Sequence, residues 1–411
     1  MEGDYSMRKL IERITHRDAL QKEIDDLEQK IEQKTLELKM LLEESNRKLN
    51  SEEEKIDILE KDRTELFKRI NECGRQDDVE IIKAGIEERL NILEKDRTDL
   101  FDRTDDINAA IKSDKHAIQE MIWASEYSNQ RLVEGISQGL SLKRKKIVHF
   151  VRCLDMYNAG DKQCGPDLYF EEFQKNFQCV VHSIKYVRFD LIREQDWVII
   201  GGGGLLECSN TYTDTINKIL DICPHVIGWG LGHNRHIKGS LYYQQELHEI
   251  NYEKFLLFTS RDWKYSEDER YCPCVSCMMP QLEREYSVKR RVGIVSHHAF
   301  PIKEFEFENH TNAESADRLV KFIGESQVII TNSFHGAYWS ILMGRKVILY
   351  KPDSSRFNFF EFLPVVYSGN IEHDIEEAVC YKNALEECRN INQAFFEEVF
   401  NMINKDKDCG D

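Results

Sequence analysis

The chain has 411 residues, enough for two or three domains with hydrophobic cores of their own. Its net charge of −18 argues against sequence-independent binding of nucleic acid. No apolar run approaches the ~20 residues that span a bilayer, and the first residues, MEGDYSMRKLIERI, contain no apolar signal-peptide core. With 12 cysteines and no such signal, we expect reduced thiols and a cytoplasmic protein.

Residues 1–145 have the composition of long helices. They contain no proline, and apolar residues keep heptad spacing, for example at Leu20, Ile24, Leu27 and Ile31. The segment ILEKDRTELFKR, which begins at Ile58, returns almost unchanged from Ile92. We therefore expect a helical coiled coil over residues 1–145. It either folds back as an antiparallel hairpin or makes the protein a homo-oligomer by pairing with another chain.

From Lys146 onward, short apolar runs alternate with helical segments. Candidate strands lie in IVHFV (147–151), CVVHSI (179–184), DWVIIGGGGLL (196–206), HVIGWGLGHN (225–234), KFLLFTSRDW (254–263) and RRVGIVSHH (290–298). Strands that alternate with helices are typical of a parallel α/β sheet. We expect two Rossmann-like lobes that face one another across a cleft, one over residues 146–284 and one over residues 285–411.

Several of the predicted strands end in glycine or in polar residues suited to an anion. A nest of backbone N–H groups is expected at Gly201, Gly202 and Gly203. His233 follows the next strand, Arg261 could clamp a phosphate or carboxylate, and His298 follows a further strand. Each position also has a purely structural alternative. The glycines could form a packing turn, Arg261 could form a structural bridge with Asp262, and His298 could belong to a solvated pair with His297.

The stretch from Val328 to Tyr350 reads as a strand, a polar turn, a helix and a second strand. Ser333, Phe334 and His335 lie at the turn, just before the predicted helix. N–H groups at a helix start favour an anion, whereas a polar side chain there can also simply cap the helix. The turn by itself does not decide between these uses.

Cys272, Cys274 and Cys277 have spacing that could suit zinc. A closed zinc site needs a fourth ligand, and the sequence has no second CxxC pair. We therefore expect no metal and no cofactor, and interpret this segment as a reduced, partly buried loop.

Seven motifs in order resemble the polysaccharide pyruvyl transferase family over residues 146–362. They are NAGD (158–161), GGGGLL (201–206), GWGLGHN (228–234), SRDW (260–263), CPCVSCM (272–278), SHH (296–298) and TNSFHGAYWSILMGRKVI (331–348). The resemblance implies a two-lobed fold similar to GT-B glycosyltransferases. It also implies that phosphoenolpyruvate donates a pyruvyl ketal group to two hydroxyls of a sugar. The acceptor would belong to a surface polysaccharide, such as an exopolysaccharide, or to a lipid-linked or nucleotide-linked precursor.

The resemblance also implies roles for individual residues. His335 and Arg261 would contact the phosphate or carboxylate of phosphoenolpyruvate. From the chemistry of the side chains, we further expect His335 or His233 to act as the acid/base. Arg261 and the nest at Gly201 to Gly203 are expected to neutralise the departing phosphate. Ser333 and Phe334 stand where many members have Arg-Leu, which removes one donor-binding charge. Further substrate contacts are expected from the other motif residues, Asn158, Asp161 and His298.

Two other functions fit the same sequence. A GT-B-type glycosyltransferase would bind a nucleotide-sugar in the C-terminal lobe. A coiled-coil scaffold would carry a degenerate, non-catalytic sugar-binding module.

Overall fold

A computed structural model describes residues 123, 146–155, 157–240 and 242–405. The predicted coiled coil of residues 1–145 lies outside the described residues, apart from Trp123, and so does its hairpin or oligomeric arrangement. Among the described helices, none combines the length and apolarity needed to cross a membrane.

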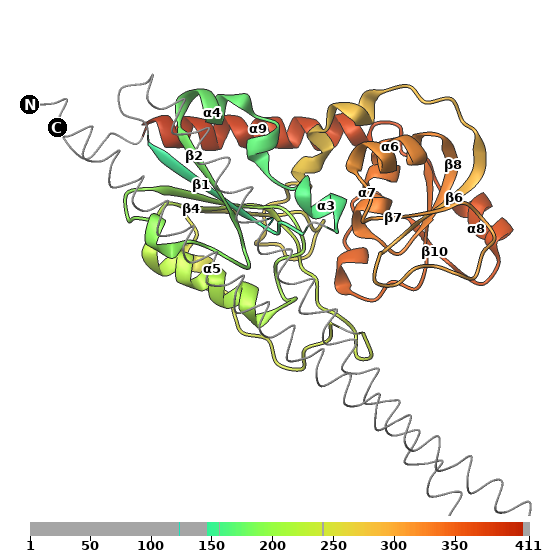
Figure 1. Ribbon diagram of the computed structural model, residues 1–411, viewed down its shortest axis with the longest axis horizontal. Coiled ribbons are helices and arrows are strands. Elements are labelled where there is room, and N and C mark those ends of the chain that lie inside the picture. Colours follow the sequence, from blue (N-terminus) through green and yellow to red (C-terminus); the bar gives the residue numbers. More distant parts are fainter. Residues whose placement is uncertain (1–122, 124–145, 156, 241, 406–411) are drawn as a thin grey trace, which may run out of the picture. The chain divides into compact units, whose positions relative to one another are not determined.

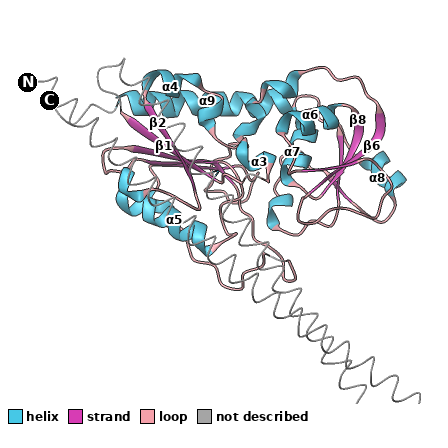
Figure 2. Cartoon of the chain, viewed as in Figure 1, coloured by secondary structure: helices cyan, strands magenta, loops and turns pink. Residues whose placement is uncertain are grey.

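The described chain is an α/β fold with two five-stranded sheets, in which every strand pairing is parallel (Figures 1 and 2). The first sheet has the order β2-β1-β3-β4-β5 and contains β1 (Ile147–Arg152), β2 (Gln178–Ser183), β3 (Trp197–Gly201), β4 (Val226–Leu231) and β5 (Leu257–Ser260). The second has the order β10-β9-β8-β6-β7 and contains β6 (Arg290–Ser296), β7 (Asn309–Thr311), β8 (Ser326–Thr331), β9 (Lys346–Leu349) and β10 (Val365–Val366).

Helices cover both faces of each sheet. The described α-helices are α3 (Ala159–Lys162), α4 (Glu171–Asn176), α5 (Asn210–Ile222), α6 (Ala316–Gly324), α7 (Phe334–Leu342), α8 (Ile371–Glu377) and α9 (Ala384–Lys405). In the first sheet, α4 and α9 lie on one face and α5 on the other (Figure 1). In the second, α6 and α7 cover one face and α8 the other.

Alternating side chains of the strands supply these two-sided cores. Phe150 packs into the cluster beneath α4 and α9, whereas its neighbour Val151 packs into the cluster beneath α5. Ile329 and Ile330 divide in the same way between the two faces of the second sheet. Because successive side chains of a strand point to opposite faces, continuous apolar runs such as these belong to sheets that are buried on both sides.

The C-terminal helix α9 extends the core of the first sheet, although it follows the second sheet in the chain. Phe396 stacks on Phe170 with ring centroids 4.2 Å apart. Asn392, which is fully buried, accepts a hydrogen bond from the Trp229 indole at 2.9 Å and donates one to the Pro273 carbonyl at 3.0 Å. Contacts of α9 with the first sheet therefore cross the lobe boundary expected at residue 285.

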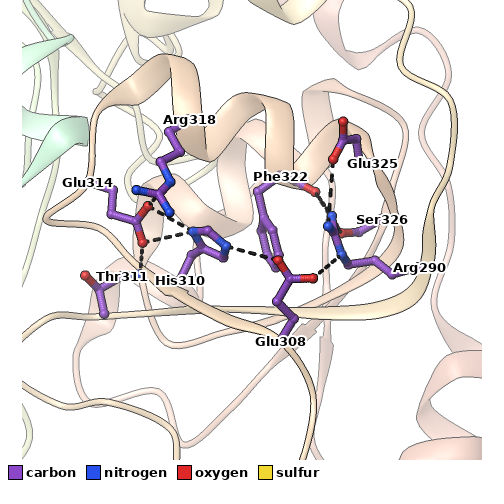
Figure 3. A network of polar contacts seen from close by, with 9 residues as sticks. All are labelled: Arg290, Glu308, His310, Thr311, Glu314, Arg318, Phe322, Glu325 and Ser326. Carbon is purple, nitrogen blue, oxygen red and sulfur yellow. Dashed lines mark hydrogen bonds and ion pairs between the residues drawn. The ribbon is translucent and has the colours of Figure 1, made fainter.

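A polar network ties the edge strand β7 to β6 and α6 (Figure 3). His310 lies between Glu314, at 2.9 Å from Nδ1, and Glu308, at 3.3 Å from Nε2. Arg290 donates to Glu308 at 3.0 Å and lies over the Phe322 ring at 4.4 Å. The network lies partly at the surface, so we interpret it as a brace for the short edge strand.

Both sheets reverse their strand order at an equivalent place. The reversal lies between β1 and β3 in the first sheet and between β6 and β8 in the second. Ligands of open parallel sheets bind at the carboxyl ends of strands beside such a switch point. The loops after β1, β3, β6 and β8 are therefore where a functional site is expected.

Candidate functional site

The loops at the two switch points touch each other. Helix α3 begins just after β1, and the N–H of Ala159 donates to the carbonyl of Asn312, which follows β7, at 2.7 Å. Gly160 lies so close to His335 at the start of α7 that an added Cβ would stand 1.9 Å from His335 Nδ1. Only a glycine allows this approach, which brings the loop after β1 against the loop after β8.

His335 faces two cysteine thiols at this contact. Its Nε2 lies 3.3 Å from Cys164 Sγ and 3.5 Å from Cys274 Sγ, and the two sulfurs lie 3.5 Å apart. The exposed fractions are 5% for His335 and 1% for each cysteine. These three side chains form the thiol–imidazole cluster, whose ligand atoms are close enough to hold a metal ion.

The two thiols of the cluster have different acidities. Burial alone would raise the pKa of Cys274, but hydrogen bonds with Cys164 and His335, together with the electrostatic influence of His335 and Arg261, hold that pKa well below its ordinary value of 9.0. Burial beside Cys274 raises the pKa of the Cys164 thiol. Cys274 is therefore the more acidic of the two thiols.

Arg261 follows β5 directly and carries its charge into the same site. Its side chain is 5% exposed, and the guanidinium carbon lies 3.6 Å from the centroid of the Phe334 ring. Within the described residues, Nε and Nη1 have no hydrogen-bond partner. Gly232 leaves space for the guanidinium, since an added Cβ there would lie 2.2 Å from Nε.

A second arginine, Arg356, lies near the first. Its side chain is 16% exposed, and its Nε has no partner within the described part of the chain. Burial lowers the pKa of the Arg356 guanidinium and Arg261 lowers it further, while Asp353 and Asp161 act in the opposite direction. The Arg356 guanidinium therefore lies within electrostatic reach of Arg261 and of the Asp161 carboxylate.

Asn158 and Asp161 both lie at this contact. Asn158 caps α3 by accepting from the Gly160 N–H at 3.1 Å, and its amide donates to Asp161 Oδ2 at 2.9 Å. Burial raises the pKa of the Asp161 carboxyl above 3.8, against the opposite effects of His335 and Arg261. The NAGD motif therefore positions a carboxylate beside the arginines and the imidazole.

Ser333 and Phe334 have clear structural partners. The Ser333 hydroxyl accepts from the Gly336 N–H at 3.4 Å and so caps α7. Phe334 stacks on Phe360 with centroids 4.8 Å apart, and its ring carries the Arg261 guanidinium. Substrate contact by Ser333 or Phe334 stays a prediction.

His233 is enclosed by acidic side chains. Its Nδ1 lies 3.0 Å from Asp262 Oδ2 and its Nε2 lies 3.5 Å from Glu269 Oε1, while Tyr265 stacks on the ring. The exposed fraction is 1%. Because both ring nitrogens face carboxylates, this geometry stabilises the loop after β4, and an acid/base role for His233 stays a prediction.

Gly201 ends β3, and Gly202 and Gly203 follow it with positive φ angles of 64° and 83°. The Gly202 N–H donates to the Trp229 carbonyl at 2.9 Å. The backbone at Gly203 approaches Asp161, since an added Cβ would lie 4.0 Å from its Oδ1. The glycine run thus allows the loop after β3 to pass beside the NAGD motif.

His298 lies after β6 and is held by Asn312. The Asn312 side-chain oxygen accepts from the His298 N–H at 2.7 Å and lies 3.1 Å from its Nδ1. Asn312 is also the residue whose carbonyl binds Ala159. His298 is therefore adjacent to the contact between the two switch-point loops.

Three features of the site were not predicted from sequence. Cys164 and Arg356 belong to no recognised motif, and of the three cysteines in CPCVSC only Cys274 faces His335. Cys272 and Cys277 instead contact Asn392, at 3.6 Å and 3.3 Å. The spacing of the three cysteines could not show which of them faces His335, because the partner thiol of Cys274, Cys164, lies 110 residues away in the sequence.

No family model matches the chain, and no curated protein matches it. Among solved structures, the chain is similar to a functionally uncharacterised protein of Klebsiella pneumoniae at 18% sequence identity, with a TM-score of 0.34. The matched region covers 54% of this chain and 86% of that protein's chain. A similarity of this size carries no argument about function.

Proposed function

We propose that this chain is a transferase of the polysaccharide pyruvyl transferase type. It would bind phosphoenolpyruvate and transfer its three-carbon group to two hydroxyls of a sugar, as a pyruvate ketal. The acceptor would be a surface polysaccharide, an exopolysaccharide or a precursor of one. The donor would lie where the loops of the two switch points meet.

The observation that carries this proposal is the buried guanidinium of Arg261. A buried polar group without a partner is unfavourable by ~1–3 kcal/mol, and more when it is charged. Arg261 leaves both Nε and Nη1 unpartnered among the described residues while only 5% of it is exposed. A carboxylate or phosphate bound to these N–H groups would relieve that cost with charge-assisted hydrogen bonds.

Two anionic groups on the donor would match two cations of the site. Phosphoenolpyruvate carries a carboxylate and a phosphate, and Arg261 lies near enough to Arg356 to lower the pKa of its guanidinium. The Asp161 carboxylate lies in the same site and would repel the anionic groups of the donor. Binding therefore requires that both arginines contact the donor. We therefore place the donor against both guanidiniums.

The two sheets support this placement. Each is parallel, with its switch-point loops at the contact between α3 and α7. We propose that they are two Rossmann-like lobes of the GT-B kind, in which the donor and acceptor meet between the loops at the strand ends.

The reaction adds one proton to the methylene carbon of the donor and removes one from each of two acceptor hydroxyls. Two C–O bonds form at the central carbon, the C–O bond to phosphate breaks, and the second hydroxyl proton leaves with the phosphate. Arg261 and Arg356 would neutralise the phosphate as it departs. His335 Nε2 faces the two thiols, so proton transfer by this nitrogen stays a prediction and is not needed for donor binding.

Phosphate release tests the proposal directly. The full chain is incubated with phosphoenolpyruvate and a panel of capsule-type oligosaccharides, and phosphate and ketal products are measured. Phosphate release that depends on an acceptor supports the proposal. Hydrolysis or transfer from UDP- or GDP-sugars, with no use of phosphoenolpyruvate, would replace it with the glycosyltransferase alternative, and inactivity toward both donor classes would favour the scaffold.

A further inference from the structure

We infer that Cys164, Cys274 and His335 bind a transition-metal ion of the zinc class. The three side chains come from separate parts of the fold: the loop after α3, the loop before η4 (Val275–Met278) and the first turn of α7. Their sulfur and nitrogen atoms converge on one point within the buried contact between the switch-point loops. The inference goes beyond the proposed transfer and does not depend on it.

The separations between the three atoms are those of ligands around one ion. With Zn–S bonds of ~2.3 Å and Zn–N bonds of ~2.0 Å, tetrahedral ligands lie ~3.8 Å apart for two sulfurs and ~3.5 Å apart for sulfur and nitrogen. The observed separations are 3.5 Å between Cys164 and Cys274, and 3.3 Å and 3.5 Å from His335 Nε2 to the two sulfurs. All three edges agree with a tetrahedral face to within ~0.3 Å.

The donor set selects the kind of ion. Two thiolates and one imidazole are soft or borderline ligands, which favour zinc over magnesium or calcium. Two sulfurs and one imidazole nitrogen are also the protein ligands of known catalytic zinc sites, which leave a fourth position for an oxygen ligand. The cluster therefore suits a zinc-class ion with a fourth position that these three side chains do not fill.

Neighbouring groups hold the three ligands in place. Gly160 leaves room for the Nδ1 side of the His335 ring, while Nε2 faces the thiols. Ser276 Oγ lies 3.3 Å from Cys274 Sγ and itself accepts from the Trp339 indole N–H at 3.1 Å. Such supporting contacts orient metal ligands and are characteristic of built sites.

A disulfide between Cys164 and Cys274 explains the geometry less well. A disulfide bond is ~2.05 Å long, so the sulfurs would have to approach each other by more than an ångström. His335 Nε2 would then lose both of its partners in a buried place. The ion keeps all three groups satisfied.

Metal content of the full chain tests the inference. Protein prepared with Zn²⁺ is freed of loosely bound metal and analysed by mass spectrometry for zinc per chain. We expect near one zinc per chain, and a fall of at least about tenfold in Cys164→Ser and Cys274→Ser. Matched controls are Cys272→Ser and Cys277→Ser, which remove buried thiols of the same loop that face Asn392 instead.

Cobalt substitution keeps the test decisive if a serine variant folds poorly. Wild-type protein loaded with Co²⁺ should show thiolate-to-metal charge transfer and the intense visible bands of a tetrahedral site. His335→Gln should weaken and shift these bands, while Cys277→Ser should retain them. No bound zinc or cobalt in the wild-type protein, or loss of metal only in the Cys272 and Cys277 variants, would overturn the inference, as would an intact mass showing a Cys164–Cys274 disulfide.

Discussion

The guanidinium carbon of Arg261 lies over the Phe334 ring, 3.6 Å from its centroid. Phe334 belongs to α7 and Arg261 follows β5, so this contact joins the second sheet's switch-point helix to the edge of the first sheet. The ring offers a cation–π contact but no hydrogen-bond acceptor. An arginine held in this way keeps its N–H groups available for an anion.

Substitution of Arg261 should separate stability from binding. Arg261→Met keeps the side-chain volume but removes a buried charge, so the ligand-free protein should unfold at the same or a higher temperature. Affinity for phosphoenolpyruvate should fall by at least about tenfold, the size of one charge-assisted pair. Thermal shift with and without the donor measures both effects.

Arg291→Met is the matched control, because Arg291 is exposed and pairs with Glu372. It should leave the response to phosphoenolpyruvate unchanged. A normal donor-induced shift in Arg261→Met would contradict the role given to Arg261.

Gly160→Ala should destabilise the protein although alanine is the better helix former. The added Cβ would meet His335 Nδ1 at 1.9 Å, and such overpacking costs ~1–3 kcal/mol. Helix propensity alone would instead stabilise the variant by ~1 kcal/mol. Denaturant unfolding of the full chain shows whether Gly160→Ala lowers or raises the free energy of unfolding.

Gly239→Ala provides the comparison for that measurement. Gly239 is exposed, has a φ of 102° and has nothing within 4 Å of an added Cβ. Gly239→Ala should therefore lower the free energy of unfolding by ~1 kcal/mol through backbone strain alone, without a steric clash. Stabilisation by Gly160→Ala would contradict the close contact between α3 and His335 of α7.

The stability of the first sheet should fall in mild acid because of His182. Burial lowers the pKa of His182 from 6.5 to about 3, with His149 and Arg188 acting in the same direction and Asp190 in the opposite one. Below pH 6.5 the unfolded chain binds a proton that the folded chain does not bind. The free energy of unfolding is therefore fully retained above pH 6.5 and falls as the pH drops toward 3, by up to ~1.4 kcal/mol per pH unit.

Denaturant unfolding between pH 7 and pH 4.5 checks this prediction. His182→Gln removes the titrating group and should flatten the dependence, even if it lowers stability at pH 7 through the lost 3.0 Å contact with His149. An unchanged pH slope in His182→Gln would assign the acid sensitivity to other groups.

Asn392 should be essential for attaching α9 to the first sheet. Asn392→Leu leaves the Trp229 indole N–H and the Pro273 carbonyl buried without their partner. We expect a loss of ~2–4 kcal/mol in the free energy of unfolding. Gln393→Leu, at the exposed neighbouring position, should change it by less than ~0.5 kcal/mol, and equal effects of the two substitutions would contradict this account.

Sequence periodicity predicted the interior strands well. The stretch from Val328 to Tyr350 forms β8, α7 and β9 as expected. Helix α7 begins at Phe334, inside the predicted turn, because Ser333 caps it. The edge strands β7 and β10 were missed, since Asn309–Thr311 is polar and Val365–Val366 is too short to show a pattern. Apolar runs reveal strands even at a sheet edge, as at β2 and β5, whereas short or polar strands depend on pairing with their neighbours.

The site was only partly predictable for a different reason. Arg261 and His335 were recognised from motifs, but the cluster also needs Cys164, which lies 171 residues from His335. The fold brings these residues together through two switch points, and no local pattern encodes that distance. Ser333 caps α7, which was one of the two uses expected of the turn, and its contact with a substrate stays a prediction.

A crystal structure of the full chain with phosphoenolpyruvate would show directly whether Arg261 binds the donor. We expect a phosphate or carboxylate oxygen of the donor within hydrogen-bond distance of Arg261 Nε or Nη1, with the other anionic group toward Arg356. Phosphoenolpyruvate bound elsewhere, with these two N–H groups still without partners, would contradict it.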